Sequence, residues 1–96
     1  MFMVQLELSQ ENIEMIKHKA SLYIEIYLGN MLYPDAPLKI VINGGEIYQI
    51  PIKSASDVTN STLGYLYMDA RTMEIERDIS SSIEDIDKAV EEIMKG

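Results

Sequence analysis

The chain of 96 residues lacks cysteine and contains a single histidine, His18. Without thiols it can form no disulfide, no thiolate metal site and no cysteine nucleophile. His18 has Glu14 four residues before it and Glu25 seven residues after it, so a carboxylate could orient its imidazole as a general base. Any helix surface offers similar neighbours, and we interpret His18 as an exposed, structurally neutral residue.

Basic residues are also scarce. Eight Lys and Arg stand against 16 Asp and Glu, which gives a formal net charge of −8. Contacts of Lys and Arg with phosphates supply most nucleic-acid affinity, so we expect no nucleic-acid partner and no binding to an anionic membrane. No run approaches the about 18 apolar residues of a membrane-spanning helix. Residues 1–10 lack a basic segment followed by a long apolar run, so we expect a cytoplasmic protein without a secretory signal.

Motifs that carry chemistry are missing as well. Gly44 and Gly45 lack the spacing of a phosphate-binding loop, and no G-x-S-x-G stretch is present. The carboxylates near the C-terminus form no D-x-D-x-D-G calcium loop and have no matching histidine. We therefore expect no metal, no cofactor and no enzymatic activity.

The residues that are present are those of an ordinary folded protein. The chain is 47% hydrophobic and 25% charged. Residues 1–96 suffice for one domain with a single core. A chain of this length buries roughly 60–65% of its unfolded surface, so its stability margin is modest and covering leftover apolar surface by dimerisation would help.

The residues from Ser9 to Tyr33 predict one long helix. Ser9 is a favourable N-cap residue, and apolar residues then recur every three or four positions. This stripe consists of Ile13, Ile16, Ala20, Ile24, Tyr27 and Met31. The alternative is a strand over residues 22–28, which alternate in polarity. It would need a turn at residues 19–21, which contain neither Gly nor Pro.

A second apolar line on another side of this helix consists of Met15, Leu22, Ile26, Gly29 and Tyr33. A helix with two apolar faces needs two covers, and the sheet supplies one of them. The other cover is either the C-terminal helix of the same chain or a second copy of the protein, because the spacing resembles a short coiled-coil seam. With a second copy, His18 would flank the seam, and association would depend on pH.

Five segments have the composition of strands: residues 2–8, 38–42, 46–52, 63–68 and 73–77. Asn43 and Gly44 tolerate positive φ angles and predict a tight hairpin turn between the second and third of these segments. Pro34 and Pro37 cannot continue the preceding helix. Residues 54–62 are small and polar and predict a loop.

The turn between the last two segments begins at Asp69, whose side chain can accept hydrogen bonds from N–H groups of the turn. Residues 64–76 (GYLYMDARTMEIE) resemble the D-A-x-T-G-E hairpin of PepSY-type and other small domains. Met73 stands where that hairpin usually has glycine. The likeness is confined to these residues, and it implies neither membership of a family nor a function.

Three serines at positions 80–82 precede a predicted C-terminal helix, in which Ser81 and Glu84 have capping-box spacing. Its apolar stripe consists of Ile79, Ile83, Ile86, Val90 and Ile93. Its carboxylates are those of Glu84, Asp85, Asp87, Glu91 and Glu92. We interpret these carboxylates as a solvated helix face, with docking of a basic protein partner as the alternative.

These elements together predict a two-layer α+β domain in the order β-α-β-β-β-β-α, with a mainly antiparallel sheet of about five strands and both helices on one face. We expect this protein to act by protein–protein association, as a homodimer through the long helix and as a module of the regulatory or inhibitor type. The alternative is a small-molecule site between helix and sheet, rimmed by the hydroxyls of Tyr23, Tyr27, Tyr65 and Tyr67.

Overall fold

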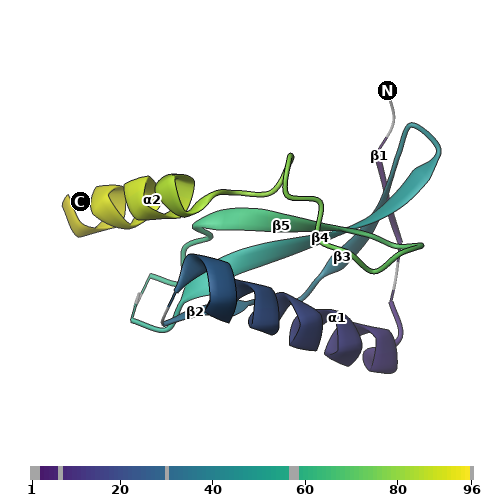
Figure 1. The fold of residues 1–96 in the computed structure, drawn as a ribbon, viewed down its shortest axis with the longest axis horizontal. Helices are drawn as coiled ribbons and strands as arrows, with labels where there is room; N and C mark the ends of the chain where they lie inside the picture. The colour runs from purple at the N-terminus through teal and green to yellow at the C-terminus, as the bar shows by residue number, and fades with distance from the viewer. Residues whose placement is uncertain (1–2, 7, 30, 57–58, 96) are drawn as a thin grey trace.

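The computed structural model describes residues 3–6, 8–29, 31–56 and 59–95, which form a two-layer α+β fold (Figure 1). Its elements are β1 (Met3–Leu6), α1 (Gln10–Tyr23), the π-helix η1 (Ile24–Leu28), β2 (Leu32–Pro34), β3 (Leu38–Ile42), β4 (Gly45–Ser54), β5 (Gly64–Asp69) and α2 (Ile83–Lys95). The predicted order of strands and helices is confirmed, although one strand is not the one predicted. Phe2 and Glu7, which belong to the predicted first strand, lie outside the described residues.

Strand β4 is the centre of a five-stranded antiparallel sheet. One of its edges pairs with β3 over residues 45–49 and then with β2 over residues 52–54, whereas its other edge pairs with β5 over residues 47–52. Strand β1 pairs with the far edge of β3. Asn43 and Gly44 join β3 to β4 with φ angles of 51° and 82°, which confirms the predicted tight turn.

Both helices pack on the same face of the sheet. Side chains alternate between the two faces of a strand, so the buried residues of β4 and β5 identify the inner face. They belong to one core cluster, which consists of Ile16, Ala20, Ile24, Leu28, Tyr48, Ile50, Ile52, Leu63, Leu66, Met68 and Ile86. Because α1 and α2 both contribute to this cluster, the predicted arrangement of two helices on one face is confirmed.

Helix α1 starts as predicted. The Ser9 Oγ accepts a hydrogen bond from the backbone N–H of Asn12 at 3.3 Å. The chain continues from α1 into η1, so the alternative of a strand over residues 22–28 is wrong. In η1 the N–H of Gly29 donates to the carbonyl of Ile24, five residues earlier, at 2.8 Å. This wider turn places Leu28 in the core and leaves Tyr27 exposed.

The predicted end of the helix at Tyr33 is wrong, because helical structure stops at Leu28. Gly29 has a φ angle of 106° and Met31 one of 69°, and the chain then enters β2. Glycine adopts such a conformation without the steric cost that a Cβ atom brings, so it ends the helix here. Met31 is consequently exposed and does not extend the buried stripe.

The predicted strand over residues 73–77 is also wrong. Among the described residues it contributes one isolated bridge, between Met68 and Ile75, and the following chain runs along the free edge of β5. The Oγ atoms of Ser81 and Ser80 accept hydrogen bonds from the N–H groups of Tyr65 and Tyr67, each at 2.9 Å. Serine hydroxyls therefore satisfy edge amides that a further strand would otherwise bond.

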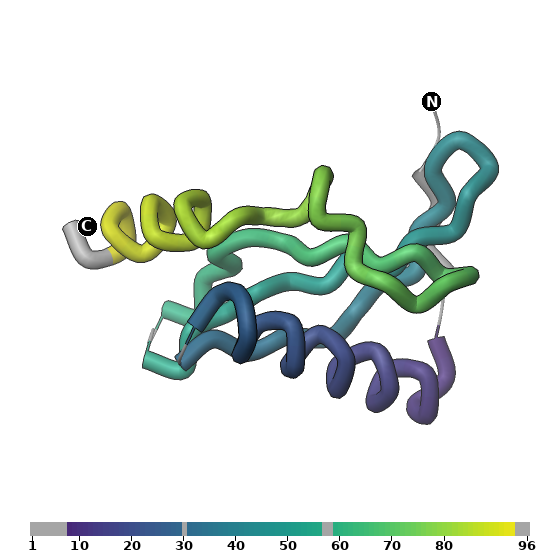
Figure 2. Tube along the Cα trace, in the orientation of Figure 1, coloured from purple at the N-terminus to yellow at the C-terminus, as the bar shows by residue number. Residues whose placement is uncertain are grey.

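Helix α2 begins at Ile83 and carries its cap one residue later than predicted. The Ser82 Oγ accepts from the N–H of Asp85 at 3.2 Å, and the Asp85 Oδ2 accepts from the N–H of Ser82 at 3.0 Å. The reciprocal cap thus joins Ser82 to Asp85, and the predicted pair Ser81 and Glu84 is wrong. Helix α2 packs against η1 and β5, and its C-terminal end extends beyond the sheet (Figure 2).

Candidate association surface

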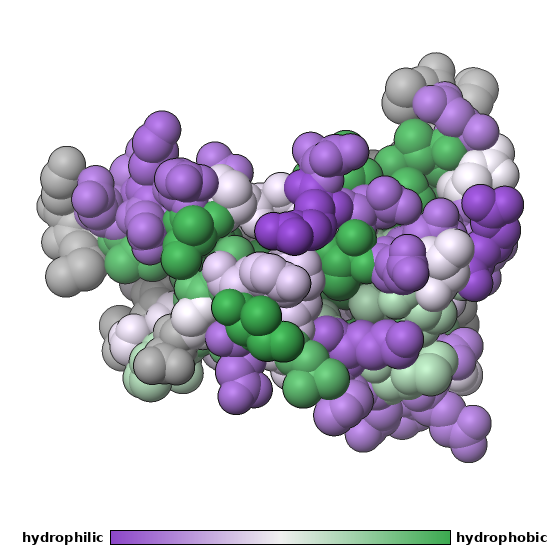
Figure 3. Space-filling view, in the orientation of Figure 1, coloured by the Kyte–Doolittle hydropathy of each residue, from purple (hydrophilic) through white to green (hydrophobic). Residues whose placement is uncertain are grey.

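The outer side of α1 and η1 carries a row of large, uncovered apolar side chains. Met15, Leu22 and Ile26 have exposed fractions of 46%, 47% and 71%. Their spacings of seven and four residues correspond to about two turns and one turn, so they line up on one side of the helix. Figure 3 shows hydrophobic side chains gathered over this helix, bordered by hydrophilic ones. We term Met15, Leu22 and Ile26 the α1 ridge.

Helix α2 does not cover the α1 ridge. Its packing residues instead face the main core, with Ile86 buried and Ala89, Val90 and Ile93 partly buried. Ile79 and Ile83, which the sequence assigned to the same stripe, are exposed, so that part of the prediction is wrong. The sequence left two possible covers for the second apolar face of the long helix. In the described part of the chain, the cover from within the same chain does not form.

The other two residues of the predicted seam lie away from the α1 ridge. Gly29 follows the last helical residue, and Tyr33 lies in β2, where its hydroxyl donates to Asn60 Oδ1 at 3.3 Å. The structure adds two exposed apolar residues near the end of the helix that the sequence assigned to the buried stripe, Tyr27 and Met31. No pattern in the sequence signals the π turn that exposes Tyr27, because the i to i−5 bond depends on the packing of Leu28.

The two helices differ in charge. Helix α1 contains two acidic residues, Glu11 and Glu14, and two basic residues, Lys17 and Lys19. Helix α2 contains five acidic residues and two basic ones. Its five acidic residues, Glu84, Asp85, Asp87, Glu91 and Glu92, are all exposed. Of the two helices, α1 is therefore the one whose surface can meet a copy of itself without strong charge repulsion.

Asp85 differs from the other acidic residues of α2. Hydrogen bonds from the backbone N–H and the side chain of Ser82 lower the pKa of its carboxyl group below the ordinary value. This carboxylate therefore belongs to the helix cap. The other four carboxylates of the predicted docking face are exposed and belong to Glu84, Asp87, Glu91 and Glu92.

The structure places the four predicted pocket tyrosines in two separate pairs. Tyr23 and Tyr27 are on the helical layer, with ring centroids 4.8 Å apart, and the Arg77 guanidinium lies 4.5 Å from the Tyr27 ring. Tyr65 and Tyr67, with centroids 6.4 Å apart, alternate in β5 with residues of the inner face. They therefore point to the opposite face of the sheet, and the two pairs do not line one cavity.

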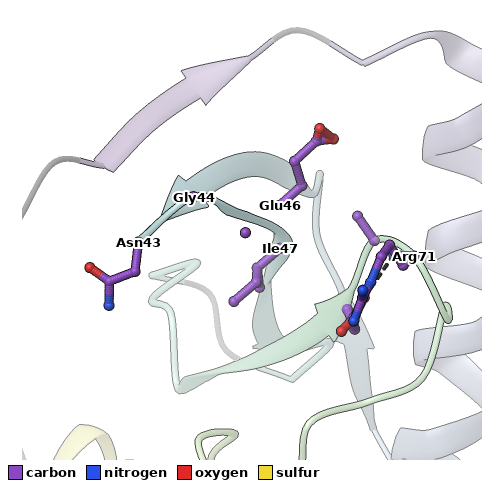
Figure 4. A pocket seen from close by; sticks show the side chains of 8 residues that line it. Asn43, Gly44, Glu46, Ile47 and Arg71 are labelled. Carbon is purple, nitrogen blue, oxygen red and sulfur yellow. Dashed lines mark hydrogen bonds and ion pairs between the residues drawn. The ribbon is translucent and has the colours of Figure 1, made fainter.

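Three hollows among the described residues lie outside the α1 ridge, one of them of about 280 Å³ between the end of the helix and the start of β2. A hollow of about 220 Å³ lies beside Tyr23, Tyr27 and the start of α2. A wider one of about 600 Å³ separates the β3–β4 turn from the turn after β5, and its lining side chains do not converge on a common point (Figure 4). There Asp69 accepts hydrogen bonds from the N–H groups of its own turn, as predicted, and Glu46 pairs with Lys39 at 2.6 Å.

Neither a metal centre nor a membrane span is found in the part of the chain that the structure describes. No group of three or more His, Asp or Glu side chains there could hold a metal ion. No helix among those residues is long and apolar enough to cross a bilayer.

The fold and the α1 ridge, in the residues that the structure describes, define a small α+β protein with an uncovered apolar face on its first helix. The chain matches no protein-family model, and no curated protein or solved structure is significantly similar to it. The features that bear on function are therefore the geometry of this surface and the charges around it.

Proposed function

We propose that this protein acts by association, and that two copies pair through the α1 ridge. The observation that carries the proposal is the exposure of Met15, Leu22 and Ile26 on a helix whose opposite side packs on the core. Burying apolar surface is worth roughly 25 cal/mol per Å², so three large side chains covered on each copy supply a substantial driving force. The small core of a 96-residue chain makes such added burial valuable.

Paired copies would leave the acidic helix α2 free. Because α2 joins the core through Ile86 and turns its carboxylates outwards, a dimer of this kind presents two acidic helices. A protein partner with a basic surface suits them, which is the behaviour of an acidic regulatory or inhibitor-type module. This part of the proposal is supported by charge and exposure alone.

Light scattering coupled to size exclusion tests the pairing. We expect the wild-type chain to run as a dimer, and the double variant Leu22→Asp with Ile26→Asp to run as a folded monomer with the wild-type circular dichroism spectrum. Asn12→Asp with Ser21→Asp is the matched control, because it adds the same two charges to exposed positions of α1 outside the ridge. The control should remain dimeric.

Two results would contradict the proposal. If the wild-type chain stays monomeric at millimolar concentration, the α1 ridge does not mediate dimerisation. A double variant that unfolds while the control stays folded would show that Leu22 and Ile26 are needed within one subunit.

A further inference from the structure

We infer that the two copies of α1 pair antiparallel about a two-fold axis, with Met15 of one copy against Ile26 of the other. This inference rests on the proposed function and specifies its partner surface. Three features point to this arrangement: Lys19 beside the ridge, the charges on the flank of the ridge, and the position of the ridge along the helix.

Lys19 decides the direction of pairing. It lies four residues after Met15 and three before Leu22, so on a helix it stands next to the ridge, between these two apolar side chains. In a parallel pair every residue meets its own copy at the same level, and two Lys19 ammonium groups would face each other across the seam. In an antiparallel pair Lys19 meets Leu22 of the other copy, which its aliphatic stem can cover while the ammonium group stays in water.

The charges on the flank of the ridge also favour antiparallel pairing. His18 and Glu25 are exposed and seven residues apart, so they lie on one flank, two turns from each other. In an antiparallel pair the same flanks of the two helices come together, with residues before the axis opposite residues after it. The imidazole of His18 on each copy then lies within about 3 Å, along the helix axis, of the level of Glu25 of the other copy, so these side chains can form two symmetric contacts of complementary charge.

The position of the ridge fixes the level of the axis. Met15 and Ile26 are equally far from a point between Ala20 and Ser21, and Leu22 of each copy lies close to that point. Helical structure extends from Gln10 to Leu28, so an axis at this level overlaps nearly the whole helix of each copy. All three ridge residues of both copies are then covered at once, which is the self-complementary contact that a two-fold axis requires.

Cysteine cross-linking tests this arrangement without background, because the chain has no cysteine. Met15→Cys and Ile26→Cys are made as separate single variants and oxidised alone or as an equal mixture. We expect the mixture to form a disulfide-linked dimer at least about tenfold faster than either variant alone, since only facing thiols come within bridging distance. Met15→Cys mixed with Ser21→Cys is the control, because Ser21 lies on α1 outside the ridge.

The outcomes separate this inference from the proposed function. If light scattering shows monomers, the proposed function fails and the inference falls with it. If the chain is dimeric but each single variant links to itself as fast as the mixture links, the pairing is parallel. In that case the inference alone is overturned. If Met15→Cys links to Ser21→Cys as fast as to Ile26→Cys, the contact has no fixed register, and the inference is overturned as well.

Discussion

Two methionines adopt backbone conformations that side chains with a Cβ atom rarely occupy. Met31 and Met73 have φ angles of 69° and 61°. Met73 packs partly against the core and stands where the resembling hairpin usually has glycine, so its side chain stabilises the fold while its backbone opposes it. Met31 is 60% exposed, and its backbone conformation therefore has no comparable compensation from packing.

Replacing Met31 should accordingly reveal this strain. We expect Met31→Gly to be more stable than Met31→Ala by about 1 kcal/mol in urea denaturation, because both lose the same side chain and only alanine keeps the Cβ atom that the left-handed conformation disfavours. Equal unfolding free energies for the two variants would show that residue 31 is not held at positive φ in solution.

The reciprocal cap of α2 makes stability depend on pH. The pKa of Asp85 is lowered in the folded state by its bonds to Ser82, so its contribution is present above the unfolded value of about 4 and is lost as pH falls through the folded value. We expect Asp85→Asn to lower the urea midpoint at pH 7, and we expect its difference from the wild type to shrink as the pH falls below about 4. Asp87→Asn, at an exposed position two residues along the same helix, should change the midpoint less. If the difference in urea midpoint between the wild type and Asp85→Asn stays constant with pH, the Asp85 carboxylate does not stabilise the cap of α2.

At the scale of elements, Gly64 joins the sheet to α2. A Cβ atom on this residue would lie 2.5 Å from Ser81 Oγ and 2.8 Å from Ile86 Cδ1, and it would displace both the edge serine and the core residue of α2. We expect Gly64→Ala to destabilise the fold by about 1–3 kcal/mol through overpacking. Gly45→Ala is the matched control, because its new Cβ atom would meet nothing closer than Ile42 O at 3.6 Å. Equal unfolding free energies for the two variants would show that α2 does not pack on Gly64.

Two local signals were predicted correctly, whereas the elements set by tertiary packing were harder to predict. The Ser9 cap and the turn at Asn43 and Gly44 are encoded by a few neighbouring residues, and both are confirmed. Strand β2 is three residues long, too short to show alternation, and it exists because β4 continues past β3. The segment after Met73 was predicted as a strand because its composition is strand-like, but it makes only a few backbone hydrogen bonds to β5 before serine hydroxyls take over that edge.

The candidate site was also predictable in part, where helical spacing decides it, and not where packing decides it. Met15, Leu22 and Ile26 follow regular helical spacing, so the sequence places them on one apolar line, and in the structure all three are exposed. Gly29 and Tyr33 were assigned to the same line because the helical spacing was continued past Leu28. The helix ends there, so neither residue lies on it. Whether a helix face is covered depends on where the other elements pack, and for that reason the sequence left both possible covers open.

At the scale of the whole molecule, charge opposes association while apolar surface favours it. Each copy carries a formal net charge of −8, and two copies repel each other most strongly at high pH and low salt. The acidic residues of α2 account for much of this charge. Within α1 the charged neighbours of His18 are Glu11 and Glu14 before it and Lys17 and Lys19 beside it. In the antiparallel dimer the partner copy adds Glu25, so the acidic groups near His18 increase on association.

Histidine is the side-chain type that changes charge between pH 5 and 8. A cationic imidazole at His18 would face an added carboxylate in the dimer, so lowering the pH should tighten association. We expect the dissociation constant from sedimentation to fall about two- to thirtyfold between pH 8 and pH 5.5, the effect of two exposed ion pairs of about 0.2–1 kcal/mol each. His18→Gln keeps the general loss of negative charge but removes the imidazole, so the difference between the two proteins isolates His18. A single unchanged constant for the wild type at both pH values, or an identical shift in His18→Gln, would rule out this role.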